Sequence, residues 1–203
     1  MSKPYKAITA VTVLITLLSI SYLNFARERF FERALNAQEA NKLLTTAVDI
    51  LTTTKLWQDS AIFILIPDVE IVTEGIGGNF GRGILVARSS EKAWGNPVFM
   101  RIASGKIETL DHTKSIAILL TFNHQQDLNS IKNGGVDATQ AQVYAYDGQD
   151  FTQVSLTGLI NVEINQTSNA NFYGQRIDVA DVIEGKTTTD SEPLTNLMAV
   201  LNH

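Results

Sequence analysis

The chain contains no cysteine among its 203 residues. Disulfide bonds, thiolate metal ligands and a catalytic thiol are therefore excluded, and so is the acylated cysteine that anchors bacterial lipoproteins. Any attachment to a membrane must be made by the polypeptide itself. The lack of cysteine is compatible with export, since an exported protein can do without disulfides.

Proline and histidine are also scarce. The chain has four prolines and no glycine/serine run or block of like charge, which predicts one compact main domain without a long linker. His112, His124 and His203 lack the spacing of metal ligands, so we expect no metal site and no cofactor. Asp111 beside His112 has no accompanying nucleophile motif, so we expect no enzymatic activity.

Positive charge is in short supply over most of the chain. The formal net charge is −5, and bases outnumber acids in the first 37 residues, so the remainder is more acidic than the whole. An acidic body is repelled by the phosphates of nucleic acids. We therefore expect no nucleic-acid partner.

An uncharged apolar stretch covers residues 7–23, preceded by Lys3 and Lys6. A helix over this stretch is roughly 25 Å long, near the lower limit for crossing a bilayer. We predict that segment 1–26 contains a hydrophobic helix that anchors the chain to a bacterial membrane, with the body periplasmic or extracellular. The alternative is a signal segment that is cleaved, so that the body is secreted.

The region after the apolar stretch has helical periodicity. Between Arg27 and about Thr54, apolar residues recur at intervals of three and four among polar ones. We predict a juxtamembrane amphipathic helix over 27–37, in which Arg27, Arg29 and Arg33 contact lipid headgroups. The rest of this helical region is expected to pack on the core.

Beyond Trp57 the pattern changes to that of short strands. We expect Pro67 to end the first strand, because proline cannot donate to a sheet ladder. Asp147 and Gly148 predict a hairpin with a type I′ turn. The strands are predicted over 61–66, 69–73, 84–88, 98–103, 116–122, 143–146, 151–156 and 158–165.

Helical patterns are fewer in this part of the chain. They cover 124–132, parts of 171–184, and a last helix that starts at Asp190 or Ser191. The predicted fold class is α+β: a meandering antiparallel β-sheet, open or partly closed into a barrel, with flanking helices. We assign residues 38–203 to this one domain.

A glycine-rich string runs from Gly75 to Gly83. It fails the dinucleotide-binding pattern, which would need glycine at Phe80, and the P-loop pattern, which would need lysine at Ile84. Glycine among strands more often permits a bulge or a close approach of two backbones. We interpret the string as structural, and whether it also lines a ligand site stays open.

Several blocks together resemble the SYLF domain family. Residues 81–88 (GRGILVAR) resemble its Gly-x-Gly-Val-Leu-Val-x-Arg element, and 94–97 (WGNP) its Trp-Ser-x-Pro block. Later, 171–174 (NFYG) are similar to its Asn-x-x-Phe-Tyr-Gly signature. The positions that carry this resemblance, expected to be structural, are Gly77, Gly78, Gly81, Gly83, Trp94, Pro97, Phe172, Tyr173 and Gly174.

The resemblance covers roughly residues 38–202 and implies a non-enzymatic lipid-binding module. Eukaryotic members bind phosphoinositides, and bacterial members are mostly envelope proteins. The chain departs from the family pattern at Gly95, where the family has serine, at 105–109, and between Gly135 and Tyr144. These departures leave the identity of the lipid open.

Two functions follow as expectations. The first is a lipid-binding module whose partner is membrane lipid, since each base at an anionic surface contributes about 1 kcal/mol. The alternative is a structural or protein-interaction component of the cell envelope, with a protein partner and no specific lipid. The candidate lipid-binding residues are Arg27, Arg29, Arg33, Arg82, Arg88, Arg101 and Lys106.

Overall fold

The computed structural model describes residues 33–72, 78–107, 116–137, 140–154 and 156–203. The chain divides into two units, 1–33 and 34–203, and the helices and strands of the described residues belong to the second. The predicted hydrophobic helix over 7–23 and most of the predicted juxtamembrane helix lie outside the described residues. Within the described ranges, none of the helices combines the length and the apolar character needed to span a bilayer.

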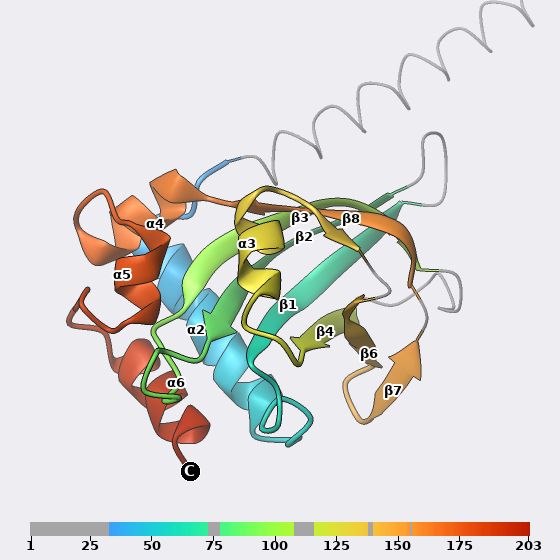
Figure 1. The fold of residues 1–203 in the computed structure, drawn as a ribbon, viewed down its shortest axis with the longest axis horizontal. Helices are drawn as coiled ribbons and strands as arrows, with labels where there is room; N and C mark the ends of the chain where they lie inside the picture. Colours follow the sequence, from blue (N-terminus) through green and yellow to red (C-terminus); the bar gives the residue numbers. More distant parts are fainter. Residues whose placement is uncertain (1–32, 73–77, 108–115, 138–139, 155) are drawn as a thin grey trace, which may run out of the picture. The chain divides into compact units, whose positions relative to one another are not determined.

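An antiparallel sheet forms the centre of the 34–203 unit (Figure 1). Its strands are β1 Ile62–Val72, β2 Gly78–Ala87, β3 Val98–Ile107, β4 Ile116–Phe122, β5 Val136–Asp137, β6 Gln142–Tyr146, β7 Phe151–Val154 and β8 Leu156–Ile164. Their order across the sheet is β5-β8-β3-β2-β1-β4-β6-β7. Among the described strands β5 and β7 do not meet, so the sheet is open. The predicted α+β class is confirmed, and a partly closed barrel is wrong.

The connections are only partly those of a meander. β1, β2 and β3 are consecutive neighbours, but β4 pairs with the other side of β1, and β8 returns to pair with β3. This order places β1 near the middle of the sheet. The side chains of 62–66 are all fully buried, on both faces of the strand. Burial on both faces explains why this strand is a continuous apolar run in the sequence.

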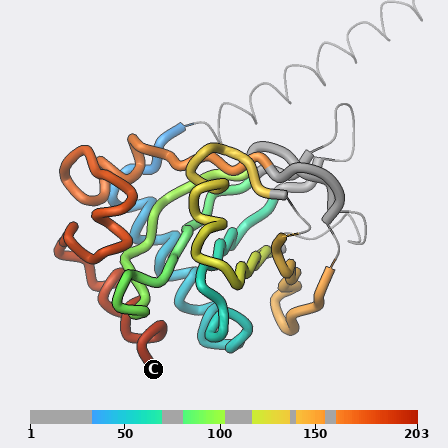
Figure 2. The backbone as a smooth tube through the Cα atoms, in the orientation of Figure 1, coloured from blue at the N-terminus to red at the C-terminus, as the bar shows by residue number. Residues whose placement is uncertain are grey.

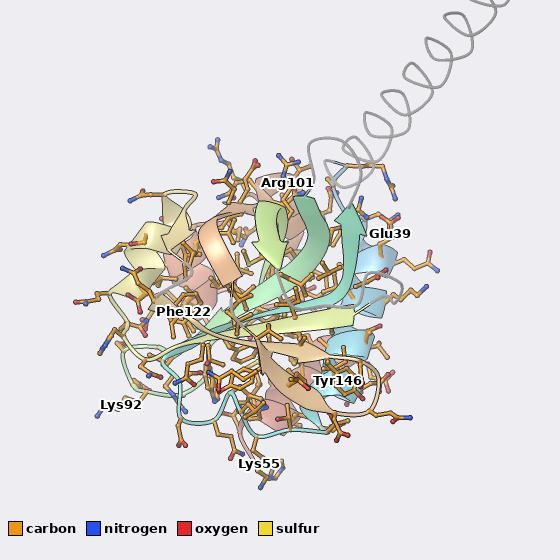
Figure 3. The ribbon with its side chains drawn as sticks, turned by 90° about the vertical axis from the view of Figure 1, so that its right-hand side faces the viewer. Glu39, Lys55, Lys92, Arg101, Phe122 and Tyr146 are labelled. Carbon is orange, nitrogen blue, oxygen red and sulfur yellow. The ribbon has the colours of Figure 1, made fainter. Side chains whose placement is uncertain are left out.

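Helices cover both faces of the sheet. They are α2 Ala37–Leu51, α3 Asp127–Lys132, α4 Gln166–Tyr173, α5 Val179–Ile183 and α6 Glu192–Leu201. α2 packs against β1, α4 and α6, whereas α3 lies across the sheet from α2, against β5 and β8 (Figure 3). The buried side chains of Leu44, Ala47 and Leu51 form the inward stripe of α2.

The start of α2 is fixed by a capping box. The Asn36 side chain accepts from the Glu39 N–H at 2.9 Å, and the Glu39 carboxylate accepts from the Asn36 N–H at 3.0 Å. Residues 33–36 are not helical. The helical region predicted from Arg27 to Thr54 is therefore interrupted at Asn36, and residues 27–32 lie outside the described residues.

Pro67 does not end β1, contrary to the sequence prediction. The strand continues to Val72 through a bulge, where the pairing with β2 shifts between Leu65 and Asp68 and the pairing with β4 shifts close by. Pro67 has no partner in either ladder. Its missing N–H therefore removes no ladder hydrogen bond, which is why a proline is tolerated in a central strand.

Two glycines of the string lie opposite this bulge. A Cβ on Gly83 would lie 2.3 Å from the Leu65 carbonyl oxygen, and one on Gly81 would lie 2.5 Å from Ile66 Cγ2. Any larger residue would force β1 and β2 apart. These two glycines therefore permit a close approach of β1 and β2, while Gly75 and Gly77 lie outside the described residues.

The predicted hairpin is formed by β6 and β7, but its turn is not type I′. Four residues, 147–150, join the strands, and of these Gly148 alone has a positive φ, at 101°. Asp147 Oδ1 instead accepts from the N–H groups of Gln149 and Asp150, at 2.9 and 3.0 Å. The aspartate closes the loop through its side chain, as short polar residues often do in turns.

The remaining helices follow the predicted pattern with shifted boundaries. The predicted stretch 171–184 contains the end of α4 and all of α5, and Gly185 follows α5 with a φ of 69°. α6 begins after Ser191, whose hydroxyl accepts from the Leu194 N–H at 3.2 Å. Both helix ends use the capping chemistry that the sequence indicated.

Candidate functional site

The structure describes the side chains of four of the seven predicted lipid-binding cations. Arg27 and Arg29 lie outside the described residues, and so does the side chain of Lys106 in β3. Arg33 is exposed at the start of the described chain. Arg82, Arg88 and Arg101 each interact with other groups of the fold.

Arg88 is bound into the fold through its whole guanidinium group. Its Nε, Nη1 and Nη2 atoms donate to the carbonyl oxygens of Ser60, Lys92 and Gln58, at 3.0, 2.8 and 2.5 Å. The group also lies over the Trp94 ring, 4.2 Å from its centroid. Arg88 therefore ties together the loops at one end of the sheet, and three of its five N–H donors are used within the fold.

Arg82 and Arg101 belong to a row of charges that crosses four strands. Asp68 in β1 is paired in register with Arg82, Arg82 with Arg101, and Arg101 with Glu163 in β8. Arg101 Nε donates to Glu163 Oε2 at 2.9 Å. Residues directly opposite each other share a face of the sheet, so this row balances two bases with two acids.

The distance along β2 also divides the predicted patch. Arg88 is six residues beyond Arg82, which corresponds to about 20 Å of extended strand. A single headgroup cannot contact both side chains.

Two of the three blocks that carry the family resemblance, 94–97 and 171–174, meet in space. The Tyr173 hydroxyl donates to the Pro97 carbonyl at 2.7 Å, and burial raises the pKa of this hydroxyl. The Phe99 and Phe172 rings are 4.9 Å apart in an edge-to-face arrangement. Gly174 ends α4 with a φ of 74°. These contacts assign the motif residues to packing between α4 and the start of β3.

Two buried polar residues of α4 were missed by the sequence prediction. Asn169, with no exposed surface, accepts from the Phe99 N–H and donates to the Phe99 carbonyl. The Ser168 hydroxyl accepts from the Leu35 N–H at 2.8 Å, 133 residues away in sequence. Figure 2 shows the start of the described chain and α4 side by side. α4 therefore connects the start of the described chain to β3.

A surface groove of about 790 Å³ lies at the edge of the sheet formed by β8. β5 pairs with β8 only at Leu159 and Ile160, so the groove lies beyond the short edge strand. Its apolar lining comes from β8 and from the segment that enters α5. Its charged lining comes from the end of α3, from Glu163 in β8 and from the residues that precede α5. The apolar residues are Val162, Ile164, Ile177 and Val179.

Two cations at the groove are unpaired within the described part of the chain. Lys132 and Arg176 are exposed, and no ion pair of either is found among the described residues. The two carboxylates of the lining are engaged elsewhere, Glu163 with Arg101 and Asp178 with the Ala180 N–H at 2.8 Å. Available positive charge beside apolar walls suits an amphiphile with a phosphate-containing headgroup.

The lining of the groove consists of charged, amide and apolar side chains together with Gly134. None of the described residues that line it is a serine, threonine or histidine. Among the described residues of the chain as a whole, no cluster of three or more His, Asp or Glu is arranged to hold a metal ion. Lys132 and Arg176 could not be recognised as site residues from the sequence, because each is an isolated base two residues from a turn glycine.

The chain matches no family model, no curated protein and no solved structure.

Proposed function

We propose that this protein is a non-enzymatic lipid-binding module attached to, or exported across, a bacterial membrane. The observation that carries the proposal is the groove at β8, where apolar walls lie beside the unpaired side chains of Lys132 and Arg176. The apolar stretch over 7–23 supports it, since such a stretch brings the chain to a membrane. The resemblance to the SYLF family supports it as well.

Different parts of the groove contribute binding free energy for the two ends of a lipid. Acyl carbons against Val162, Ile164, Ile177 and Val179 gain about 0.8 kcal/mol for each methylene buried. The headgroup phosphate lies in the charged part of the same groove and binds Lys132 and Arg176. Glu163 is paired with Arg101, and Asp178 offsets part of the charge of Lys132 and Arg176, so we expect only a modest preference for a singly anionic over a zwitterionic headgroup.

The test is a calorimetric titration of the full chain in lauryldimethylamine oxide, a detergent without phosphate. The ligands are dihexanoyl phosphatidylcholine, dihexanoyl phosphatidylglycerol and, as the headgroup alone, glycerol 3-phosphate. We expect both short-chain lipids to bind, and glycerol 3-phosphate to bind much more weakly. Equal binding of glycerol 3-phosphate would indicate a simple anion site, and no binding of either lipid would exclude the groove.

A matched pair of variants locates the site. Arg176→Ser removes a cation from the groove and should weaken the binding of both lipids about five- to tenfold. Lys42→Ser removes an exposed cation from α2, far from the groove lining, and should leave binding unchanged. The same loss in both variants would mean that net charge, rather than the groove, governs binding.

A second candidate function, a protein-interaction role in the cell envelope, is favoured by β7. Among the described strands, β7 pairs only with β6, and its Thr152 and Gln153 are exposed. The strand contains neither proline nor charge, the usual protections of an open edge. Cross-linking in intact cells that yields one stoichiometric protein, with no lipid in the purified sample, would favour this function over lipid binding.

A further inference from the structure

A second pocket, of about 560 Å³, lies beyond the C-terminal end of α2. One wall is the loop between α2 and β1, which includes Lys55, Leu56 and Asp59. The facing side comes from β4 and β6 and from the residue that follows β4. Lys55 lies at the lower edge of the molecule in Figure 3. This pocket shares no lining residue with the groove at β8.

Thr121 offers a hydroxyl to this pocket from an otherwise buried side chain. The residue is 3% exposed and lines the pocket from β4. Across all the described residues, no hydrogen bond of its side chain is found. Because the residue lines the pocket, its hydroxyl can donate to, or accept from, a ligand that enters there.

Neutral polar groups surround this hydroxyl. Gln142 lies directly opposite Thr121 in the β4–β6 pairing. The Tyr144 hydroxyl donates to Gln142 Oε1 at 2.8 Å, which leaves the Gln142 NH₂ group as a donor and the Tyr144 oxygen as an acceptor. Asn123 adds an exposed amide. The pocket therefore offers both hydrogen-bond donors and acceptors, which suits a ligand rich in hydroxyl groups, since each hydroxyl can donate and accept.

The charges of the pocket cancel, since Lys55 is matched by Asp59. A phosphate would require stronger positive charge, and a metal ion more than one carboxylate. Leu56, 38% exposed, and the half-buried Tyr144 supply apolar surface next to the polar groups. The negative face of an aromatic ring attracts the weakly positive C–H groups on one face of a sugar.

We propose that this pocket binds a neutral saccharide, either free or as the sugar headgroup of a glycolipid. The sugar hydroxyls bond to Thr121, Gln142 and Asn123, and its C–H face lies on Leu56 and Tyr144. The volume is within the range of small-molecule sites and accommodates a mono- or disaccharide. This proposal is independent of lipid binding at the groove.

The experiment is saturation-transfer NMR on the full chain in lauryldimethylamine oxide, which carries no sugar. The probes are glucose, N-acetylglucosamine and maltose, with octyl glucoside as the glycolipid probe and glycerol as a polyol without a ring. We expect transfer to at least one ring sugar, with a dissociation constant of about 1 mM, and none to glycerol. Transfer to octyl glucoside alone would assign the pocket to glycolipid headgroups.

Thr121→Val tests the site without disturbing the fold, because the lost hydroxyl has no partner among the described residues. We expect binding to weaken about fivefold, as for one neutral hydrogen bond. Thr152→Val makes the same change at an exposed position in β7 and should have no effect. Arg176→Ser, which removes a groove cation, should also leave sugar binding intact.

Two results would overturn the proposal. One is the absence of transfer to every ring sugar, including octyl glucoside, at concentrations of about 10 mM. The other is transfer that is unchanged in Thr121→Val and also in Tyr144→Leu, which would place the sugar elsewhere.

Discussion

The side-chain amide of Asn169 pairs with both backbone groups of Phe99, as a neighbouring strand would. Its Oδ1 accepts from the Phe99 N–H at 2.8 Å, and its Nδ2 donates to the Phe99 carbonyl at 2.9 Å. Both residues are buried, so water cannot replace either bond. A helix thereby completes the hydrogen bonding of β3 at the end where the strand enters the sheet.

Asn169→Asp should lower the free energy of unfolding by about 3 kcal/mol. The carboxylate keeps the acceptor for the Phe99 N–H but places negative charge against the Phe99 carbonyl. Urea denaturation followed by circular dichroism measures the change. Asn129→Asp, at an exposed position of α3, is the control and should change stability little. Equal effects of the two substitutions would contradict this role of Asn169.

Gly95→Ser, which introduces the residue of the resembled family, should destabilise this chain. A Cβ at position 95 would lie 2.0 Å from the Ile183 carbonyl oxygen. α5 must move to admit it, at an expected cost of more than about 2 kcal/mol. Thermal unfolding measures the loss, with Ala93→Ser on the exposed part of the same loop as the control. An unaltered melting temperature would show that α5 yields freely.

Arg88→Lys should destabilise the fold while leaving lipid binding unchanged. A lysine has a single nitrogen and cannot reach the carbonyls of Ser60, Lys92 and Gln58 together, nor stack on Trp94 as a planar group. We expect a loss of about 2–3 kcal/mol in urea denaturation. Calorimetry with short-chain lipid, well below the denaturation midpoint, should give the wild-type affinity. Weaker lipid binding would return Arg88 to the list of lipid ligands.

The Glu184 carboxylate should make stability depend on pH in the acidic range. The Ser90 hydroxyl and N–H donate to it at 2.7 and 3.1 Å, and these bonds hold its pKa below the usual glutamate range. A lowered pKa in the folded state stabilises the protein above the unfolded-state pKa. This contribution is lost as the pH falls through the folded-state pKa.

Glu184→Gln measures this contribution. The melting temperature of the variant should be lower than that of the wild type near pH 7, and the difference should shrink as the pH falls through the acidic range and the carboxylate is protonated. Glu91→Gln is the control, since Glu91 is an exposed acid of the same loop as Ser90 and makes no hydrogen bond of its side chain to another described residue. A difference that does not change with pH would mean that the charge is not responsible.

The sequence predicted the elements better than their connections. The apolar run 116–122 matches β4, and Leu128 and Ile131 are buried in α3 as expected. Local periodicity reports which face of an element is buried, and this information is present in each segment. It does not report which strands pair, so the return of β8 to β3 was not predicted. The prediction that Pro67 ends the first strand was wrong, because the bulge that accommodates the proline depends on the partner strands.

The candidate site was predicted less well, for a related reason. Because all three are basic, Arg82, Arg88 and Arg101 were predicted to bind lipid together. The groups that each arginine contacts depend instead on its neighbours in the fold. Glu163, which pairs with Arg101, is 62 residues away in sequence. Lys132 and Arg176 come close only because two loops converge on the edge of β8. No local sequence pattern predicts that these two segments lie close together.

The attachment of Leu35 to α4 has a mechanical consequence. The Leu35 N–H is held by the Ser168 hydroxyl and its carbonyl by the Asn171 amide, at 2.8 and 2.9 Å. Tension applied to the chain ahead of residue 34 therefore loads these two bonds before it reaches the sheet. On the proposal that residues 7–23 anchor the chain to a membrane, a pull from that anchor would be borne first by α4 and only then by the strands.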